Sequence, residues 1–366
     1  MKRILLSAVL ITSLSLTANA NTTADTSSAK TTQKSDNGVI ITPDNFIQAD
    51  SVRAFFKEIE QSKGKVNVVR PVRELTNTDN QDVIRMNRDT LYTRTVLDVT
   101  GGASITTKEY AGFQNINVID INHGQVASLT GHGTLKIDES MLTEGHHVYV
   151  IVRTGLLRNL SEDEMMAKAH QAQDAVSVAF KSSTPFTPPV KYDFSTLDKV
   201  KYKILKAFAI NPQKDVAKLG LGTVKERDPD AARVVVAIGW GALAGQEAVY
   251  SAFSGQKERV SFTIDSKPNA NKTGFFSVTI YNGDGYIATL NYAINSDDMV
   301  ANKDGSYTMT FLASGEPIKE GEKNVIRTPR GKVWTGVLRS YNIKDKEEGF
   351  KWVDHWTEKM NKAFAK

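Results

Sequence analysis

The last third of the chain alternates short apolar stretches with turn-forming sequences, and this pattern constrains the fold more than any other feature. Residues 282–285 (Asn-Gly-Asp-Gly) and 302–305 (Asn-Lys-Asp-Gly) predict tight connections, because Asn, Asp and Gly tolerate positive φ angles. Regularly spaced short strands with such turns favour an antiparallel sandwich or jelly roll. The strands expected here cover residues 260–264, 275–281, 286–294, 307–312 and 333–341.

The first part of the chain is also rich in expected strands. Residues 90–99 alternate, with Leu91 and Leu97 on one face and Tyr92 and Arg94 on the other. Further strands are expected at residues 115–122 and 147–152. Apolar spacing and capping residues predict helices at residues 44–63, from a capping box at Ser161, at 197–211, from 230 towards 250, and from 345 onwards.

These patterns predict a mainly β (α+β) chain, with two antiparallel β-sandwich or jelly-roll-like domains joined by a helical segment. In chain order we expect a signal peptide (1–20), a flexible leader (21–38), an N-terminal β-rich domain (39–185), a helical connection (186–255), a C-terminal β-sandwich (256–342) and a C-terminal helix (343–366).

The first twenty residues have the form of a secretory signal peptide. Lys2 and Arg3 precede an apolar run at residues 4–16, and Ala-Asn-Ala at residues 18–20 predicts cleavage after Ala20. The alternative, a membrane anchor, needs about 20 apolar residues, and this run is shorter. We therefore expect a periplasmic or secreted protein that does not span a membrane.

Composition excludes several classes of function. The 366 residues contain no cysteine, so disulfides, thiolate nucleophiles and iron–sulfur clusters are excluded. The formal charge is +5, and Lys2 and Arg3 supply two of these charges, which leaves +3 on the processed chain. Basic and acidic residues are interleaved throughout, so we expect no nucleic-acid partner.

The densest polar cluster is Arg-Met-Asn-Arg-Asp-Thr-Leu-Tyr at residues 85–92. In a functional interpretation Asp89 is a general base or an anchor and the Tyr92 ring lies over the site. The expected ligand-binding side chains of this segment are Asn87, Arg88, Thr90 and Arg94, of which either arginine would hold an anion. In the alternative interpretation the segment is a structural turn, in which Asn and Asp side chains bond to local backbone.

Arg339 and Tyr341 extend the candidate site. They lie two residues apart on the last expected strand and therefore share a face. If that face looks toward the first domain, Arg339 joins Asp89 and Tyr92 as a catalytic side chain, and Tyr341 joins the ligand-binding residues. Clefts between domains are common ligand sites. The alternative is a buried Arg–Asp bridge that only fixes the two domains.

The same regions resemble a known pair of domains. Residues 87–92 (Asn-Arg-Asp-Thr-Leu-Tyr), followed by an alternating strand and Asp98, resemble the signature of the domain of unknown function 1254. The C-terminal third resembles its usual partner, the domain of unknown function 1214. The matching segments are residues 150–154 and 169–174 for the first domain, and 239–241, 245, 250, 276–281, 284–285, 302–306 and 338–341 for the second.

This resemblance implies two mainly β domains in one chain, often in secreted bacterial proteins, and it implies no agreed reaction. One departure is visible. Members often carry Asn-Trp-Leu-Pro before the last strand, whereas residues 324–327 here are Asn-Val-Ile-Arg. If that tryptophan lines a pocket, the pocket of this protein differs.

No metal or cofactor site is expected. His146 and His147 would point to opposite faces of a strand, so a metal would need one of them to meet His123 and His132 across neighbouring strands. We expect turn and surface histidines instead. A serine nucleophile elbow and a Gly-rich phosphate loop are both missing. Trp334, Trp352 and Trp356 are expected to seal a core edge, with a carbohydrate-stacking face as the alternative.

Three functions remain open. The first is an exported envelope protein that binds a small-molecule or envelope-polymer ligand at the cleft between its domains. The second is a periplasmic hydrolase that uses Asp89 as general base, with Tyr92 and Arg94 or Arg339 orienting the substrate. The third is a structural homo-oligomer.

Overall fold

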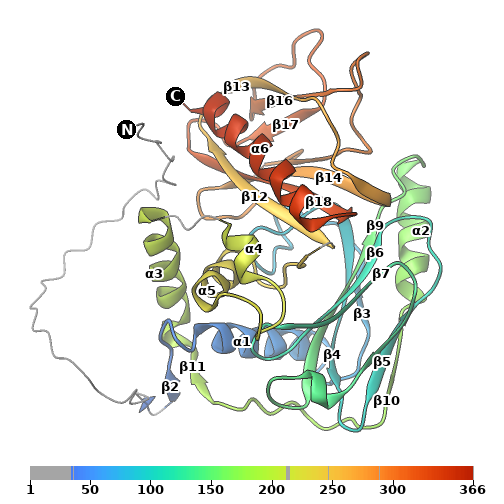
Figure 1. Ribbon diagram of the computed structural model, residues 1–366, viewed down its shortest axis with the longest axis vertical. Coiled ribbons are helices and arrows are strands. Elements are labelled where there is room, and N and C mark those ends of the chain that lie inside the picture. The colour runs from blue at the N-terminus through green and yellow to red at the C-terminus, as the bar shows by residue number, and fades with distance from the viewer. Residues whose placement is uncertain (1–33, 36, 212–214, 246, 288, 366) are drawn as a thin grey trace, which may run out of the picture.

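The computed structural model describes residues 34–35, 37–211, 215–245, 247–287 and 289–365. The expected signal peptide and most of the expected leader lie outside these residues. The structure is 26% helix and 32% strand, with several antiparallel sheets, so the mainly β (α+β) expectation is confirmed. Figure 1 shows the C-terminal strands in the upper half and the large N-terminal sheet with its helices in the lower half.

A five-stranded antiparallel sheet in the order β3-β4-β9-β6-β7 is the centre of the N-terminal part. One face packs on the sheet β10-β5-β8 through Leu97, Ile116 and Val150. Because side chains alternate along a strand, Tyr149 and Ile151 point to the other face, toward the helices. The strands are β3 (Arg70–Val72), β4 (Thr90–Asp98), β5 (Ala103–Thr107), β6 (Gln114–Ile119), β7 (Gln125–Thr130), β8 (Gly133–Ile137), β9 (His147–Gly155) and β10 (Ser177–Phe180).

Five helices accompany this sheet. They are α1 (Phe46–Gln61), α2 (Glu162–Asp174), α3 (Leu197–Ile210), α4 (Val216–Gly220) and α5 (Pro229–Ile238). The expected capping box before α2 is confirmed, because Ser161 and Glu164 bond to each other's backbone amides. A small sheet joins β1 (Lys34–Ser35), β2 (Gly38–Ile40) and β11 (Tyr192–Asp193), and two short 3-10 turns cover Glu139–Met141 and Phe194–Thr196.

The helix expected from residue 230 towards 250 ends early, and the prediction is wrong beyond Ile238. Gly239 follows the last helical residue, and Gly241 has a φ of +82°, a left-handed conformation that a helix cannot continue. Residues Ala248–Gly255 form strand β12 instead, which pairs along its whole length with β18. The end of the expected helical connection therefore lies within the C-terminal sheet.

The C-terminal part is a pair of sheets closed by a helix. The sheets have the orders β12-β18-β14-β15 and β13-β16-β17. Helix α6 (Lys346–Phe364) begins at its Asp345 cap and packs into the core between them with Val353, Trp356 and Met360. The remaining strands are β13 (Arg259–Ile264), β14 (Ala270–Asn282), β15 (Ala293–Asn295), β16 (Tyr307–Ala313), β17 (Val325–Thr328) and β18 (Trp334–Ile343).

The prediction of a strand at residues 286–294 is wrong for most of this segment. Of its described residues only Ala293 and Ile294 belong to a strand; they pair with β14 and lie at the start of β15. Before it, the Ile287 amide donates to Gln81 Oε1 over 2.6 Å, and Asn291 has a φ of +54°, so the segment bonds to a distant loop instead of continuing a ladder. Trp334, Trp352 and Trp356 were expected to seal a core edge; Trp334 and Trp356 are buried within this core, and Trp352 is partly buried and packs against it.

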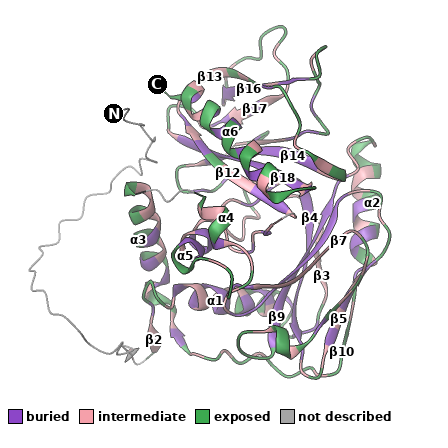
Figure 2. Ribbon diagram, viewed as in Figure 1, coloured by how far each residue is buried: buried purple, intermediate pink, exposed green. Residues whose placement is uncertain are grey.

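The sheet β12-β18-β14-β15 is buried on both faces. One face packs on the core with α6 through Val249, Val278 and Leu338, and the opposite face carries Phe275 and Tyr341, which pack on Phe113 of the N-terminal part. Figure 2 shows the buried strands of both parts meeting near the centre of the molecule. This contact between the two parts is where the candidate site lies.

Candidate functional site

The segment at residues 85–90 is a turn that leads into β4 and rests on the C-terminal part. The Arg85 amide donates to the Gly285 carbonyl over 2.9 Å. Asn87 Oδ1 accepts the Asp89 amide over 3.0 Å, which is the Asx geometry expected of such a sequence. The Asn87 side-chain amide donates to Tyr341 Oη over 3.0 Å. One asparagine therefore shapes the turn and also holds the other part of the chain.

Asp89 is buried, and both of its carboxyl oxygens accept hydrogen bonds from the C-terminal part. Ser277 Oγ donates to Oδ2 over 2.6 Å, and Asn295 Nδ2 donates to Oδ1 over 3.2 Å. Burial raises the pKa of Asp89, and the Ser277 hydrogen bond and the charge of Arg339 oppose this rise only in part. The carboxyl group thus joins the two parts of the protein.

Arg339 lies in the same contact. Its Nη2 donates to the Arg85 carbonyl over 2.9 Å and to Tyr281 Oη over 2.6 Å. Tyr281 in turn donates to the Met86 carbonyl over 2.6 Å. Of the residues predicted from the sequence, the structure therefore brings Asn87, Asp89, Arg339 and Tyr341 together at the buried contact between the two parts.

The register of the C-terminal sheet explains this gathering. Tyr250 on β12 pairs with Arg339 on β18, which pairs with Ser277 on β14, which pairs with Asn295 on β15. Cross-strand partners project from the same face of a sheet. These four residues form one line across the sheet, which we call the C-terminal row.

A second polar line crosses the N-terminal sheet. Tyr92 on β4 pairs with Arg153 on β9, which pairs with Asn115 on β6 and through it with Thr130 on β7. We call these four residues the N-terminal row. The Arg153 guanidinium lies 5.7 Å from the Tyr92 ring centroid, and its Nη2 donates to the Gly241 carbonyl over 2.6 Å. Arg153 was not predicted from the sequence.

The charge of Arg153 in the N-terminal row influences a tyrosine of the C-terminal row. Burial raises the pKa of Tyr250 in the C-terminal row, and both Arg153 and Arg339 lower it in part through their charges. Burial likewise raises the pKa of Tyr341, on which Arg339 and Tyr92 also act. The arginines of both rows are therefore close enough to influence the same tyrosine hydroxyl.

Several buried polar atoms near these rows have no hydrogen-bond partner within the described residues. Native proteins leave few such atoms, and each one calls for an explanation such as bound water or a ligand. On these faces of the two sheets the unpartnered atoms are Arg153 Nη1, Arg339 Nη1, Asn115 Oδ1, Asn117 Nδ2 and Oδ1, and Thr279 Oγ1.

The remaining predicted residues have other partners. Arg94 forms an ion pair with Asp82 over 2.5 Å, and burial of Asp82 is outweighed by Arg94 and Lys57, which lower the pKa of Asp82 to about 2. The Arg88 guanidinium lies 5.9 Å from the Tyr292 ring centroid. Thr90 is buried beside Asn87 at the start of β4.

No cluster of three or more His, Asp or Glu side chains that would hold a metal occurs in the part of the chain that the structure describes. His123 is buried and accepts the Gly241 amide on Nε2 over 2.9 Å. His147 and His170 bond to the carbonyls of Thr184 and Arg73. Among the described residues, no helix is long and apolar enough to cross a membrane.

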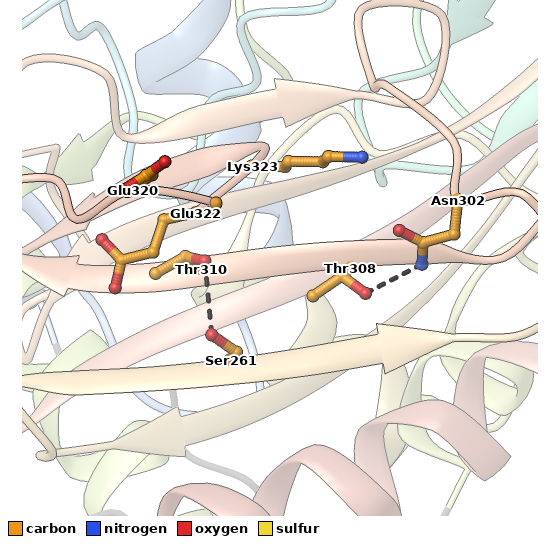
Figure 3. A pocket seen from close by; sticks show the side chains of 8 residues that line it. Ser261, Asn302, Thr308, Thr310, Glu320, Glu322 and Lys323 are labelled. Atoms are coloured by element: carbon orange, nitrogen blue, oxygen red, sulfur yellow. Dashed lines mark hydrogen bonds between the residues drawn. The ribbon is translucent and has the colours of Figure 1, made fainter.

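Two surface grooves lie outside the polar rows. The larger, of about 740 Å³, lies where α4 and the start of α6 approach β7, and Gln125, Arg227, Ala244, Glu247 and Phe350 are among its lining residues. The second, of about 490 Å³, crosses β13 and β16, and Figure 3 shows that its hydroxyl and amide side chains bond to one another. Its lining residues are Ser261, Asn302, Thr308, Thr310, Glu320, Gly321, Glu322 and Lys323.

In comparisons with known proteins, a family model matches the C-terminal part of the sequence, and a solved structure matches the fold over most of the chain. A family described as "Protein of unknown function (DUF1214)" matches residues 244–345. The expected resemblance of the C-terminal domain is confirmed. The resemblance of the first domain to the domain of unknown function 1254 stays a prediction. No curated protein matches the chain.

Two solved structures are similar to this chain. The VPA0106 protein from Vibrio parahaemolyticus is 16% identical, with a TM-score of 0.59, and the match covers 84% of this chain and 95% of that one. A putative uncharacterized protein from Burkholderia cenocepacia is 11% identical, with a TM-score of 0.48 and coverage of 82% and 84%. The first likeness shows a shared fold and nothing of function.

Proposed function

We propose that this protein is an exported binding protein that holds a small polar molecule between its N-terminal and C-terminal parts. The observation that carries the proposal is the set of unpartnered buried polar atoms near the two rows. A buried donor or acceptor without a partner costs free energy. A bound molecule that pairs with these atoms would recover that energy and would be recognised by them.

The position of Asp89 favours binding over hydrolysis. A general base must reach the proton that it removes, but both Asp89 oxygens already accept hydrogen bonds from Ser277 and Asn295. Asp89 also lines neither of the two grooves described above. The raised pKa of Asp89 has a sufficient cause in burial at the contact.

Export is the second element of the proposal, and it rests on the signal sequence at residues 1–20. Expression of the full chain in a bacterium should give a periplasmic or secreted product whose first residue is Asn21. A product that keeps residue 1 and stays in the cytoplasm would contradict this element and leave the binding proposal untouched.

The binding element is tested on the purified chain from residue 21 onwards. We expect at least one member of a panel of sugars, amino acids and small carboxylates to raise the melting temperature in a concentration-dependent manner. Native mass spectrometry should show the complex at one molecule per chain. Asn117→Leu, which replaces the unpartnered amide with an apolar side chain of similar size, should weaken this effect. Asn271→Leu, at an exposed residue of β14, is the matched control.

Two results would refute the proposal. If no panel member stabilises the chain and a high-resolution crystal structure shows only ordered water on the unpartnered atoms, the site is a hydrated contact. If esterase or glycosidase substrates turn over and Asp89→Asn abolishes the turnover, the hydrolase alternative replaces it.

A further inference from the structure

The two arginines of the polar rows lack acidic partners. Arg153 and Arg339 are 6% and 4% exposed. In the described part of the chain no carboxylate lies within ion-pair distance, 4.0 Å, of either guanidinium group, although the other buried arginine of the N-terminal sheet, Arg94, pairs with Asp82. A buried charge is normally compensated by a nearby opposite charge. The contact between the two parts therefore holds two positive charges without a direct counterion.

Each guanidinium also has one nitrogen, Nη1, that donates to no partner among the described residues. Nη2 of Arg153 is held by the Gly241 carbonyl, and Nη2 of Arg339 is held by Tyr281 and Arg85, but Nη1 of each is buried without a partner. These hydrogen bonds hold the two guanidinium groups at the contact. Arg153 bonds to Gly241, and the amide of Leu243, two residues further on, donates to the hydroxyl of Tyr250. Tyr250 is the cross-strand neighbour of Arg339, so the two guanidinium groups lie around one region of the contact.

Asp89 does not supply the missing negative charge fully. It acts on Arg339 through its charge, but its two oxygens are occupied by Ser277 and Asn295, and burial favours its neutral form. A planar guanidinium suits the paired oxygens of a carboxylate or a phosphate, which accept in line with its fork of donors.

We propose that the molecule bound between the two parts is an anion, and that its carboxylate or phosphate oxygens accept hydrogen bonds from Nη1 of Arg153 and Nη1 of Arg339. This inference rests on the proposed binding function and names the class of its ligand. The tyrosine hydroxyls of Tyr92 and Tyr250, one from each row, would then border the anion.

The test is isothermal titration calorimetry on the chain from residue 21 onwards at low salt. The anionic probes are succinate and inorganic phosphate, and succinamide is the neutral analogue of succinate. We expect a saturable isotherm with at least one anion and none with succinamide. Because a hydrogen bond to a charged group is lost, Arg153→Met or Arg339→Met should weaken binding by roughly 10- to 100-fold.

The variants are chosen so that folding survives. Met keeps the length and the apolar part of the side chain and leaves no buried charge, but it removes the donor to the Gly241 carbonyl in one variant and the donor to the Arg85 carbonyl and Tyr281 in the other. Each Arg→Met chain should therefore melt below the wild type and stay folded at the temperature of the titration, which a thermal melt checks. Arg330→Met is the matched control, since Arg330 is half-exposed and pairs with Glu316 far from the rows. It should bind the anions as the wild type does.

The outcomes separate this inference from the proposed function. Binding of succinamide as tight as that of succinate would overturn the anion class and leave the binding function in place. Anion binding that is unchanged in both Arg153→Met and Arg339→Met would place the anion elsewhere and overturn the assignment. If neither anion binds, the inference fails, and the sugars of the panel described above decide the binding function separately. A response to phosphate but not to succinate identifies a phosphate-type ligand, and the reverse identifies a carboxylate.

Discussion

Acid should destabilise this protein through His123, and the size of the effect follows from the structure. His123 is 4% exposed, and burial together with the nearby charge of Arg227 lowers its pKa to about 3. Its Nε2 accepts the Gly241 amide, so this nitrogen carries no proton in the folded chain. In the unfolded chain the pKa returns to about 6.5.

Between pH 6.5 and 3 the unfolded chain therefore binds a proton on this ring that the folded chain does not. The stability that the neutral ring contributes is fully present above pH 6.5 and is lost as the pH falls. Each pH unit in this window costs ~1.4 kcal/mol, so the loss between pH 7 and pH 4.5 is about 2.5 kcal/mol.

The assay is urea unfolding, followed by tryptophan fluorescence, of the wild type and His123→Asn at pH 7 and pH 4.5. Asn suits the left-handed backbone of this residue, whose φ is +58°, and it has no charge to gain. The variant should lose about 2.5 kcal/mol less than the wild type over this interval. His132→Asn, at an exposed histidine, should lose as much as the wild type. Equal losses in the wild type and His123→Asn would refute the reasoning.

Three further predictions concern stability. Burial raises the pKa of Asp89, so the folded chain keeps a proton that the unfolded chain loses above about pH 4. This contribution to stability declines as the pH rises and opposes that of His123, so the unfolding free energy of Asp89→Asn minus that of the wild type should increase from pH 4 to pH 7, and a decrease would contradict the sign. Gly336→Ala should cost ~1–3 kcal/mol in urea, because its Cβ would lie 2.3 Å from the Phe253 ring, whereas Gly239→Ala has open space and should be nearly neutral. Equal effects of the two glycine variants would count against the packing argument. Trp356→Ala should lower the free energy of unfolding by about 3–5 kcal/mol, because it leaves a cavity where α6 packs into the core. A loss below about 1 kcal/mol would mean that the helix is not part of the core.

Much of the fold could be predicted because its signals are local. The alternation at residues 90–99, the Ser161 capping box and the apolar spacing of α6 each depend on residues within a few turns or pleats of one another. Strand β12 could not be predicted in this way. Gly239, Gly241 and Gly245 interrupt the preceding helical stretch, but they do not show that a strand follows, and residues 248–255 are a strand because β18 offers a partner far along the chain.

Only those residues of the candidate site that stand in a distinctive local sequence could be predicted. Asn87 and Asp89 belong to a dense polar motif, and Arg339 and Tyr341 share a face by simple alternation. Arg153 stands alone in the apolar strand Val-Ile-Val-Arg-Thr, and only the register against Tyr92 shows that it faces the contact. A single charge inside an otherwise apolar strand was the one signal that could have identified it.

The place of β18 in the chain has a consequence for biosynthesis. In the sheet this strand lies between β12 and β14, yet in the sequence it follows both of them and every other strand of the described residues. The face that carries Arg339 is therefore incomplete on a ribosome-bound chain until residue 343 has been made. Until then Arg153 has its contacts with Gly241 and Tyr92 but lacks the part of the contact that β18 supplies. The buried contact between the two parts can therefore form only after β18 has been made.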